Sequence, residues 1–171
     1  KGTYELGSVF KPFTFASALN KDLIKPETEF LNLPKSIRCE KHRIGEYDNE
    51  IPSDLSAEQI LIRSGNIGSV RIAQKIGPKK YKSFLEKIGV LSQISFDIEE
   101  VAPQKNYNFG KCKLATASFG HGIATTILQL AKGYSIISNG GFDIKPTLIN
   151  KSIQNNKKGK RILKEGVSAQ V

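Results

Sequence analysis

The chain has 171 residues, which is enough for one domain with a hydrophobic core. Hydrophobic residues make up 39% and charged residues 25%, a composition typical of a folded domain and not of a disordered segment. The longest uncharged run, Leu114 to Ala131, is broken by glycines, threonines and a histidine, so we predict no membrane span. The chain opens on a lysine without a signal peptide, and we expect it to be a piece of a longer protein.

The chain is strongly basic, with a formal net charge of +10 from 26 basic and 16 acidic residues. Most lysines are spread along the sequence, and only residues 155–164, NNKKGKRILK, form a cluster. A solvated basic surface is the simpler interpretation, and attraction to an anionic partner is the alternative. No recognition-helix, zinc-binding or stacking-aromatic pattern accompanies the charge, so we predict no nucleic-acid binding.

Cysteines and histidines are few. Cys39 and Cys112 lie far apart, without a CxxC pattern or the spacing of metal ligands. They can form one disulfide bond in an oxidising compartment or remain two free thiols, and the sequence leaves both possibilities open. His42 and His121 are too few for a metal site without carboxylates, so we assign neither as a ligand.

The first predicted element is a helix that begins near Ser8 or Val9 and ends near Asn20. Apolar residues recur along it at the spacing of one helix face. Pro12 falls in the first turn, where a missing N–H costs nothing. Prolines interrupt residues 24–54, for which we expect loops and short strands.

Three helices are expected in the middle of the chain, at residues 57–63, 67–76 and 78–88. Ser56 and Gln59 have the spacing of a capping box that begins the first of them. Gly77 is suited to end the second helix, Pro78 to open the third and Gly89 to close it.

A longer helix is predicted in the last third of the chain. Residues 90–113 look irregular, and the helix then begins at a cap on Thr125 and ends at the Asn-Gly-Gly run of residues 139–141. Its predicted apolar face consists of Ile127, Leu130, Ala131 and Tyr134.

A hairpin is predicted after this helix. Strand candidates at residues 145–154 and 160–164 flank a turn at Gly159. Residues 165–171 suggest the start of a further helix. The chain is therefore predicted to be mostly helix with little strand.

The stretch YELGSVFKPFT, residues 4–14, places Ser8 three residues before Lys11, on the same face of the predicted helix. A serine hydroxyl becomes a nucleophile when a base takes its proton, and a lysine kept neutral by burial can be that base. The free N–H groups of a helix N-terminus stabilise developing negative charge. By itself the spacing is weak evidence, because a turn and a helix cap produce it too.

A second polar motif, Ser64-Gly65-Asn66, separates two predicted helices, where a loop can present side chains to a cleft. A hydroxyl there can relay a proton between the lysine and a leaving group. The asparagine amide offers a donor and an acceptor, which suits a substrate peptide bond. The alternative is a helix-breaking turn in which Ser64 and Asn66 are ordinary caps.

Together these stretches resemble the transpeptidase domain of the penicillin-binding proteins, and within them the class B branch that builds septal or side-wall peptidoglycan. YELGSVFKPFT resembles the first motif of the family, and RSGNIGSVRIAQKIG resembles the second motif, S-x-N, at the start of its helix. ATASFGHGIATTILQLAKGYSIISNGG resembles the stretch that leads toward the third motif. The blocks keep the family order, and the resemblance covers nearly all of residues 1–171 as one partial domain.

The resemblance implies roles for four residues. Ser8 would be the nucleophile that attacks the penultimate D-alanine carbonyl of a stem peptide ending in D-Ala-D-Ala, and Lys11 would be its general base. Ser64 would pass protons, and Asn66 would orient the lysine and the substrate amide. The backbone N–H of Ser8 would form half of the oxyanion hole. β-Lactams would acylate Ser8 as substrate mimics, and no metal or cofactor is expected.

The sequence departs from the family pattern in three places. Leu6 stands where the family usually has proline and Val9 where it often has threonine, and both changes are mild. No K-T-G or K-S-G triplet follows Gly141, although in the family this third motif grips the substrate carboxylate and supplies the second oxyanion donor. Because loss of one such donor costs about 100- to 1000-fold in rate, we expect this chain by itself to be close to inactive.

For the fold, the resemblance implies an α+β domain of the serine β-lactamase-like kind that lacks most of its central antiparallel sheet. We expect a mostly helical fragment with one hairpin and an exposed apolar face that would support homodimers. The resemblance also implies other cell-wall synthesis or division proteins as partners. It implies a location at the outer side of the cytoplasmic membrane, with an anchor helix outside this chain.

Three alternative interpretations remain. A serine β-lactamase or penicillin-sensing domain shares S-x-x-K, but its second motif often ends on an aliphatic residue, whereas Asn66 stands here. A D,D-carboxypeptidase fits the block ending in SNGG less well. A non-catalytic scaffold or binding domain, which keeps the fold without the chemistry, is compatible with the missing third motif.

Overall fold

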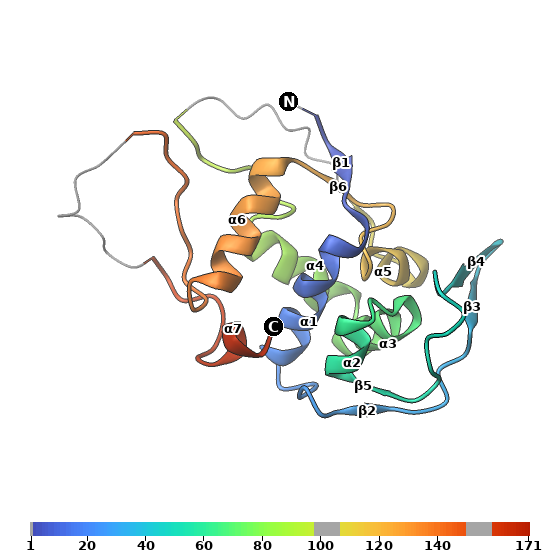
Figure 1. The fold of residues 1–171 in the computed structure, drawn as a ribbon. Helices are drawn as coiled ribbons and strands as arrows, with labels where there is room; N and C mark the ends of the chain where they lie inside the picture. Colours follow the sequence, from blue (N-terminus) through green and yellow to red (C-terminus); the bar gives the residue numbers. More distant parts are fainter. Residues whose placement is uncertain (1, 98–106, 150–158) are drawn as a thin grey trace.

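The computed structural model describes residues 2–97, 107–149 and 159–171 (Figure 1). Its helices are the 3-10 helix η1 (Gly7–Phe10), α1 (Lys11–Leu19), α2 (Ala57–Ile62), α3 (Asn66–Ile76), α4 (Pro78–Lys87), α5 (Lys111–Ala117), α6 (Ile127–Ser138) and α7 (Val167–Gln170). The strands are β1 (Tyr4–Glu5), β2 (Glu29–Phe30), β3 (Ser36–Cys39), β4 (His42–Gly45), β5 (Leu55–Ser56) and β6 (Ala124–Thr125). Among the described residues they form three two-stranded antiparallel sheets, β1–β6, β2–β5 and β3–β4. The predicted excess of helix over strand is confirmed.

Helix α1 is the centre of the fold (Figure 1). Every residue of it except Pro12 is buried, and it contacts α2, α3, α4 and α7. Apolar residues lie on all sides of this helix, so it must be covered on all sides, and the buried Thr14 hydroxyl donates to the Ser118 carbonyl at 2.8 Å. Phe10 and Phe13 pack edge to face with ring centroids 5.3 Å apart. The N-terminal end of α1 is therefore held from several directions.

The predicted boundaries of the middle helices are confirmed to within one residue. The Ser56 hydroxyl accepts a hydrogen bond from the Gln59 N–H at 3.2 Å and caps α2. Gly77 ends α3 with a φ of 81°, a conformation that favours glycine. Pro78 is the first residue of α4.

The predicted cap and apolar face of α6 are wrong. Thr126 is the cap, with a reciprocal capping box to Gln129, because Thr125 is held in β6 and donates to the Val90 carbonyl at 2.8 Å. This shifts the helix start by one residue and turns a different face inward. The buried residues of α6 are Gln129, Gly133, Ile136 and Ile137, whereas Ile127, Ala131 and Tyr134 are exposed.

Helix α5 was not predicted, and its first residues lie in the stretch expected to be irregular. Its seven residues begin after Gly110 without a capping side chain, so local sequence gives little signal. Contacts with α3 and α4 stabilise it instead. Tertiary packing commonly determines such short helices.

The pairing of residues 160–162 also differs from the prediction. Phe142 and Arg161 form an antiparallel bridge, and the Ile162 N–H donates to the Gly141 carbonyl at 2.7 Å. The strand partner is therefore residues 141–143, not residues 145–149. Residues 150–158 of the predicted hairpin lie outside the described residues. The further helix expected after residue 165 is confirmed as α7.

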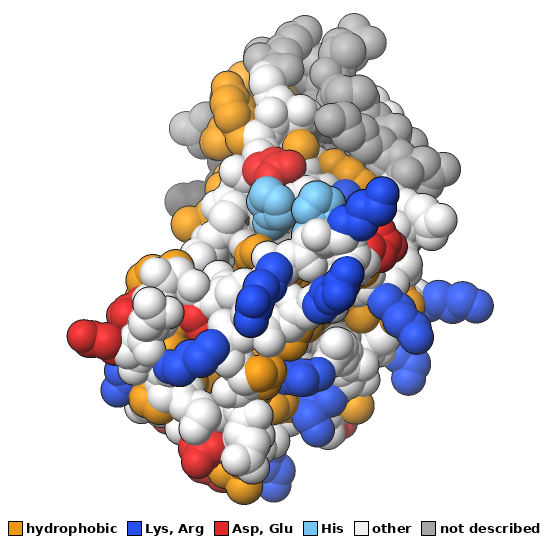
Figure 2. All heavy atoms as spheres, turned by 90° about the vertical axis from the view of Figure 1, so that its right-hand side faces the viewer, with side chains coloured by type: hydrophobic (Ala, Val, Ile, Leu, Met, Phe, Trp, Pro, Cys, Tyr) orange, Lys and Arg blue, Asp and Glu red, His pale blue; other side chains and the backbone are white. Residues whose placement is uncertain are grey.

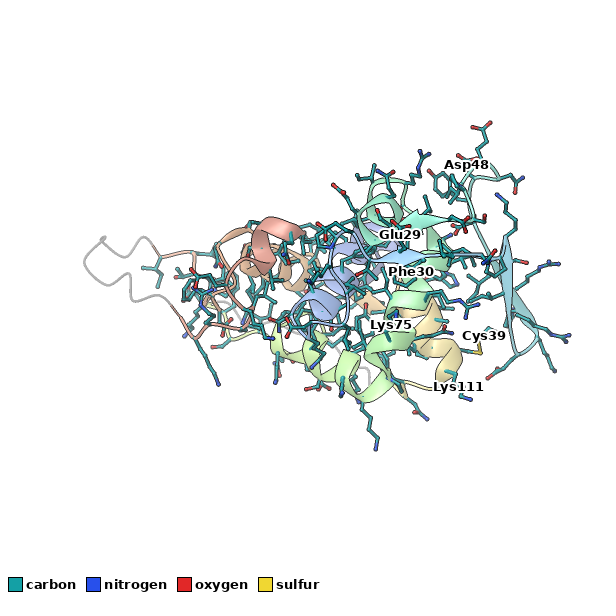
Figure 3. All side chains as sticks on the ribbon, turned by 90° about the horizontal axis from the view of Figure 1, so that it is seen from below. Glu29, Phe30, Cys39, Asp48, Lys75 and Lys111 are labelled. Carbon is teal, nitrogen blue, oxygen red and sulfur yellow. A yellow bond between two sulfur atoms is a disulfide. The ribbon has the colours of Figure 1, made fainter. Side chains whose placement is uncertain are left out.

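The β3–β4 hairpin extends from the edge of the helical body, and Figures 1 and 3 both show it at the periphery. A disulfide bond joins Cys39 at the end of β3 to Cys112 in α5, with the two Cα atoms 5.5 Å apart. This decides between the two possibilities that the sequence left open.

Lys and Arg side chains are scattered over the face that carries this hairpin, with white and orange atoms between them (Figure 2). Such a distribution is typical of a solvated basic surface. Within the described ranges, no helix has the length and apolar character that crossing a membrane requires.

Close packing at Gly120 gives a test of the fold. A Cβ atom there would lie 2.0 Å from the Gly7 carbonyl oxygen, at a residue with a φ of 79°. We predict that Gly120→Ala lowers the free energy of unfolding by about 2–5 kcal/mol, from left-handed strain together with overpacking.

Gly166→Ala is the matched control, because Gly166 has a φ of 83° but no atom within 4 Å of the added Cβ. Its free energy of unfolding should fall by about 1–2 kcal/mol, from left-handed strain alone. Urea denaturation followed by circular dichroism measures both, and equal losses would contradict the predicted close packing.

Candidate active site

The nucleophile candidate lies on the helical turn that leads into the central helix. Ser8 is exposed in η1, and Lys11 is the first residue of α1 with 1% of its surface exposed. The Lys11 Nζ atom lies 3.1 Å from the Ser8 Oγ atom. The structure thus places the two residues at hydrogen-bonding distance, with the serine open to solvent and the lysine beneath it.

The second motif supplies three more oxygen atoms to the same lysine. Lys11 Nζ lies 2.8 Å from Ser64 Oγ, 2.5 Å from the Ser64 carbonyl oxygen and 2.9 Å from Asn66 Oδ1. Ser64 has a φ of 54°, a left-handed conformation that is unfavourable for a serine. In this conformation both the carbonyl oxygen and the hydroxyl of Ser64 contact Lys11.

Burial changes the ionisation of Lys11. Loss of hydration lowers the pKa of its ammonium from 10.5 to about 8, and the nearby Glu46 carboxylate partly opposes the change. At pH 7 about a tenth of the molecules then carry a neutral Lys11. Four oxygens lie within hydrogen-bonding distance of Lys11 Nζ, and the neutral amine has a lone pair that can accept the Ser8 proton.

Glu46 is a residue of this site that the sequence analysis missed. It directly follows β4, and its carboxylate accepts hydrogen bonds from the N–H groups of Asn66 at 2.6 Å and Ile67 at 2.9 Å. Gly65, at the N-cap position of α3, has no side chain to do this. Asn66 Nδ2 also donates to the Gly45 carbonyl at 3.0 Å. In the sequence, the one signal was that Gly65 cannot cap α3, so the first N–H groups of this helix need an acceptor from another part of the chain.

Two contacts hold the turn of the nucleophile from the other side. The Gly7 N–H donates to the Gly120 carbonyl at 3.2 Å, in the loop that follows α5. The Tyr134 hydroxyl, on α6, donates to the Val9 carbonyl at 2.6 Å. Helices α5 and α6 thereby fix the backbone on either side of Ser8.

The chemistry that this arrangement supports is acyl transfer. It joins an exposed hydroxyl, a buried amine with a lowered pKa and a second hydroxyl within reach of the same amine. Within the part of the chain that the structure describes, no group of three or more His, Cys, Asp or Glu side chains could hold a metal ion.

A family model described as the penicillin binding protein transpeptidase domain matches residues 1–171. The chain belongs to this family. The match agrees with the resemblance carried by the S-x-x-K and S-x-N motifs. Ser8, Lys11, Ser64 and Asn66, the four residues to which the resemblance assigned roles, lie together in the structure.

Two curated relatives show how much of a longer protein the chain covers. The peptidoglycan D,D-transpeptidase FtsI homolog of Mesostigma viride is 30% identical over 179 residues, covering 90% of this chain and 28% of the relative. The probable peptidoglycan D,D-transpeptidase PenA of Neisseria flavescens is 29% identical, covering 98% of this chain and 41% of the relative. The chain spans less than half the length of either.

Solved structures confirm the fold of this penicillin-binding protein domain. The transpeptidase domain of Burkholderia pseudomallei penicillin-binding protein 3 superposes with a TM-score of 0.85, over 99% of this chain and 52% of the other, at 22% identity. A peptidoglycan glycosyltransferase from Burkholderia ambifaria gives a TM-score of 0.84 at 22% identity, over 99% of this chain and 54% of the other. The described residues therefore form part of a larger transpeptidase fold, as predicted.

The contact between Glu46 and the lysine site yields a prediction about charge. Because the Glu46 carboxylate raises the pKa of Lys11, Glu46→Gln should lower that pKa further below 8. Titration of the Lys11 side-chain carbon signals by NMR measures it. Glu40→Gln, an exposed position on the same hairpin, is the control and should leave the titration unchanged. An unchanged or raised Lys11 pKa in Glu46→Gln would show that Glu46 does not act on the lysine.

Proposed function

We propose that the chain is the part of a peptidoglycan D,D-transpeptidase that forms the serine acyl-enzyme, and that its covalent inhibitors are β-lactams. The observation that carries the proposal is the position of the buried Lys11 amine, between Ser8 Oγ at 3.1 Å and Ser64 Oγ at 2.8 Å. The relatives named as peptidoglycan D,D-transpeptidases support the same substrate class.

In the first step, Ser8 Oγ attacks the carbonyl carbon of the penultimate D-alanine of a stem peptide. Neutral Lys11 takes the hydroxyl proton as the new C–O bond forms. Ser8 is the second residue of the helical turn η1, where backbone N–H groups lack acceptors within the helix, and its N–H would stabilise the oxyanion. Asn66 holds the lysine through its Oδ1 atom.

In the second step, the proton travels from Lys11 through the Ser64 hydroxyl to the amine of the departing D-alanine. The C–N bond breaks, and the stem peptide remains as an ester on Ser8. An amine from a neighbouring stem peptide then attacks this ester, gives up its proton to the same relay and releases Ser8. The products are a new peptide cross-link and free D-alanine.

We further propose a place for the whole protein, at the outer side of the cytoplasmic membrane among other cell-wall synthesis or division proteins. The names of the relatives support this place. Exposed apolar side chains such as Ile62 and Leu148 support association with a second copy.

The residues 1–171 contain no K-T-G or K-S-G triplet after Gly141. We propose that these residues alone acylate slowly, because they supply one oxyanion donor where the reaction needs two. A loss of about 100- to 1000-fold is typical for one missing donor.

The first experiment is the intact mass of the protein after incubation with a penicillin. A version extended at its C-terminus through a K-T-G strand should gain one penicilloyl group, and Ser8→Ala should gain none. The chain of 171 residues should show a weaker adduct. Absence of any adduct on the extended version would replace the transpeptidase proposal with the non-catalytic scaffold.

The pKa of Lys11 predicts the pH dependence of acylation. The folded pKa is about 8 and the active form is the neutral amine, so the second-order rate constant should rise from pH 6, reach half its maximum near pH 8 and level off above about pH 9. Lys11→Arg, which stays charged at every pH, should lose about 100- to 10,000-fold. Stopped-flow measurements with a chromogenic cephalosporin give the profile. A profile that is flat from pH 6 to 9 would exclude Lys11 as the base.

A further inference from the structure

We propose that the Cys39–Cys112 disulfide bond makes this active site sensitive to redox state, because it braces the hairpin that holds Asn66 against Lys11. The catalytic consequence depends on the function proposed above, whereas the brace itself does not. One covalent link and a continuous series of hydrogen bonds connect the hairpin to α5 and to the lysine.

The hydrogen bonds run from the base of the hairpin to the lysine. Gly45 ends β4 and accepts a hydrogen bond from Asn66 Nδ2 at 3.0 Å. Glu46 follows and accepts from the Asn66 and Ile67 N–H groups. Asn66 Oδ1 in turn lies 2.9 Å from Lys11 Nζ. Movement of the hairpin base would therefore displace an oxygen atom bound to the lysine.

The hairpin packs on the body through β4, which contacts α3, and through a few apolar side chains. It consists of two strands of four residues, and Ile44 is the one buried residue in them. A two-stranded hairpin of this kind is marginally stable alone. The exposed residues at its outer end are Arg38, Glu40, Lys41, His42 and Arg43.

The disulfide bond attaches the outer end of the hairpin to the body as well. Cys39 is the last residue of β3 and pairs with His42 across the hairpin, so the bond holds the end that lies farthest from Gly45. Cys112 lies in α5, which packs against α3, the helix that begins with Asn66. The bond closes a loop with a sequence separation of 73 residues, and such a long closure strongly restricts the chain. Both ends of the hairpin are thereby attached to the body that carries the site.

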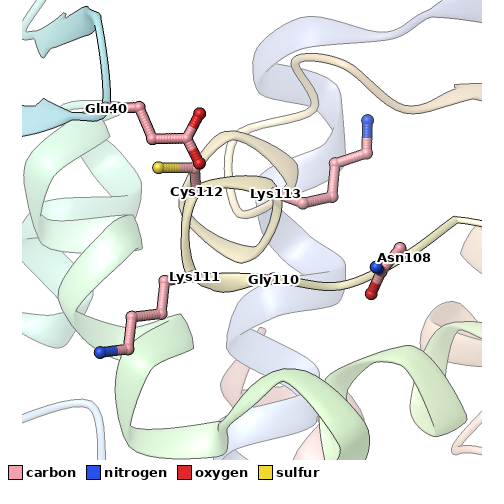
Figure 4. Close-up of a pocket in the computed structure, with 6 residues that line it drawn as sticks. All are labelled: Glu40, Asn108, Gly110, Lys111, Cys112 and Lys113. Atoms are coloured by element: carbon pink, nitrogen blue, oxygen red, sulfur yellow. The ribbon is translucent and has the colours of Figure 1, made fainter.

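The bond is open to small reductants. Cys39 and Cys112 are both partly exposed. Cys112 lines a hollow of about 500 Å³ together with Glu40, Asn108, Gly110, Lys111 and Lys113 (Figure 4). Lys111 and Lys113 point to different sides of α5, while Glu40 lies on the hairpin side of Cys112 (Figure 4). Figure 3 shows Cys39 and Lys111 at the same edge of the molecule.

The redox step is a thiol–disulfide exchange with a dithiol reductant or an oxidoreductase of that class. One thiolate of the dithiol attacks a sulfur of the Cys39–Cys112 bond, and the other cysteine leaves as a thiolate. The second thiol of the reductant then resolves the mixed disulfide. Two electrons and two protons pass to the cysteines, and the reductant becomes a disulfide. An oxidised partner of the same class reverses the reaction.

The test compares acylation by a fluorescent penicillin before and after reduction of the protein extended through a K-T-G strand. Reduction with a dithiol, followed by desalting without oxygen, should lower the acylation rate constant about tenfold, within the range that displacement of a catalytic group produces. The double variant Cys39→Ser/Cys112→Ser should have the lower rate from the start. Its rate should not change with the dithiol, which controls for effects of the reductant on the rest of the protein.

Hydrogen exchange tests the brace without catalysis. In the chain of 171 residues, reduction should speed exchange of the Asn66 and Ile67 amides, which donate to Glu46. Amides of α6, which is remote from the hairpin in Figure 1, should keep their rates and report on global stability. A uniform change over all helices would mean that the bond stabilises the fold in general, and the brace would be rejected.

The outcomes separate the two proposals. Selective exchange at Asn66 and Ile67 with a lower acylation rate supports the redox-sensitive site. Unchanged exchange and unchanged acylation after complete reduction, verified by mass, would overturn it. If the oxidised extended protein takes no penicillin at all, the proposed function fails, and the exchange data alone decide whether the bond is a brace.

Discussion

The site depends on the burial of one amine. Lys11 is almost completely excluded from solvent, and an ammonium in that position is destabilised unless oxygen atoms replace the lost water. Ser8, Ser64 and Asn66 supply these oxygens from two segments separated by more than 50 residues. The hydrogen bonds of Lys11 therefore stabilise the contact between these two segments, and they also position the amine that acts as a base in the proposed reaction.

Two opposing electrostatic effects set the pKa of that base. Desolvation lowers it and the Glu46 carboxylate raises it, and desolvation is the larger effect, with a resulting pKa of about 8. A general base is most useful when its pKa lies near the working pH. Glu46 also caps α3 through Asn66 and Ile67, so one carboxylate both moderates the charge of Lys11 and fixes the start of the helix that faces it.

Close packing turns this electrostatic arrangement into a defined geometry. Gly68 on α3 lies against Ile60 of α2, where an added Cβ would be 2.5 Å from the isoleucine side chain, so the loop between the helices is tight. Gly120 lies similarly against the Gly7 carbonyl beside the nucleophile. The central helix α1 is buried along nearly its whole length and begins with Lys11, and Ser8 lies in η1 directly before it. A small shift of either loop would lengthen the hydrogen bonds between Lys11 Nζ and the oxygens of Ser8, Ser64 and Asn66.

The amino-acid sequence by itself determined the features that depend on local interactions. The helices at α1 to α4 follow from helical spacing of apolar residues together with Ser56, Gly77 and Pro78, whose effects act within one turn. The Ser8–Lys11 pair is local as well, since three residues on a helix span one face. Ser64 and Asn66 could be assigned to the same site from the family resemblance, without knowledge of their contacts.

Only the tertiary structure decided what lies between distant segments. It placed Glu46 at the start of α3, joined Cys39 to Cys112, formed α5 and moved the cap of α6 to Thr126. Glu46, Cys39, Cys112 and α5 have their partners far along the chain, where packing and burial of polar groups select them. Thr126 and Gln129 do have the local spacing of a capping box, and the contact of Thr125 with the distant Val90 decides which threonine is the cap. The lowered pKa of Lys11 belongs to the same class, since a lysine loses its hydration only when the rest of the fold encloses it.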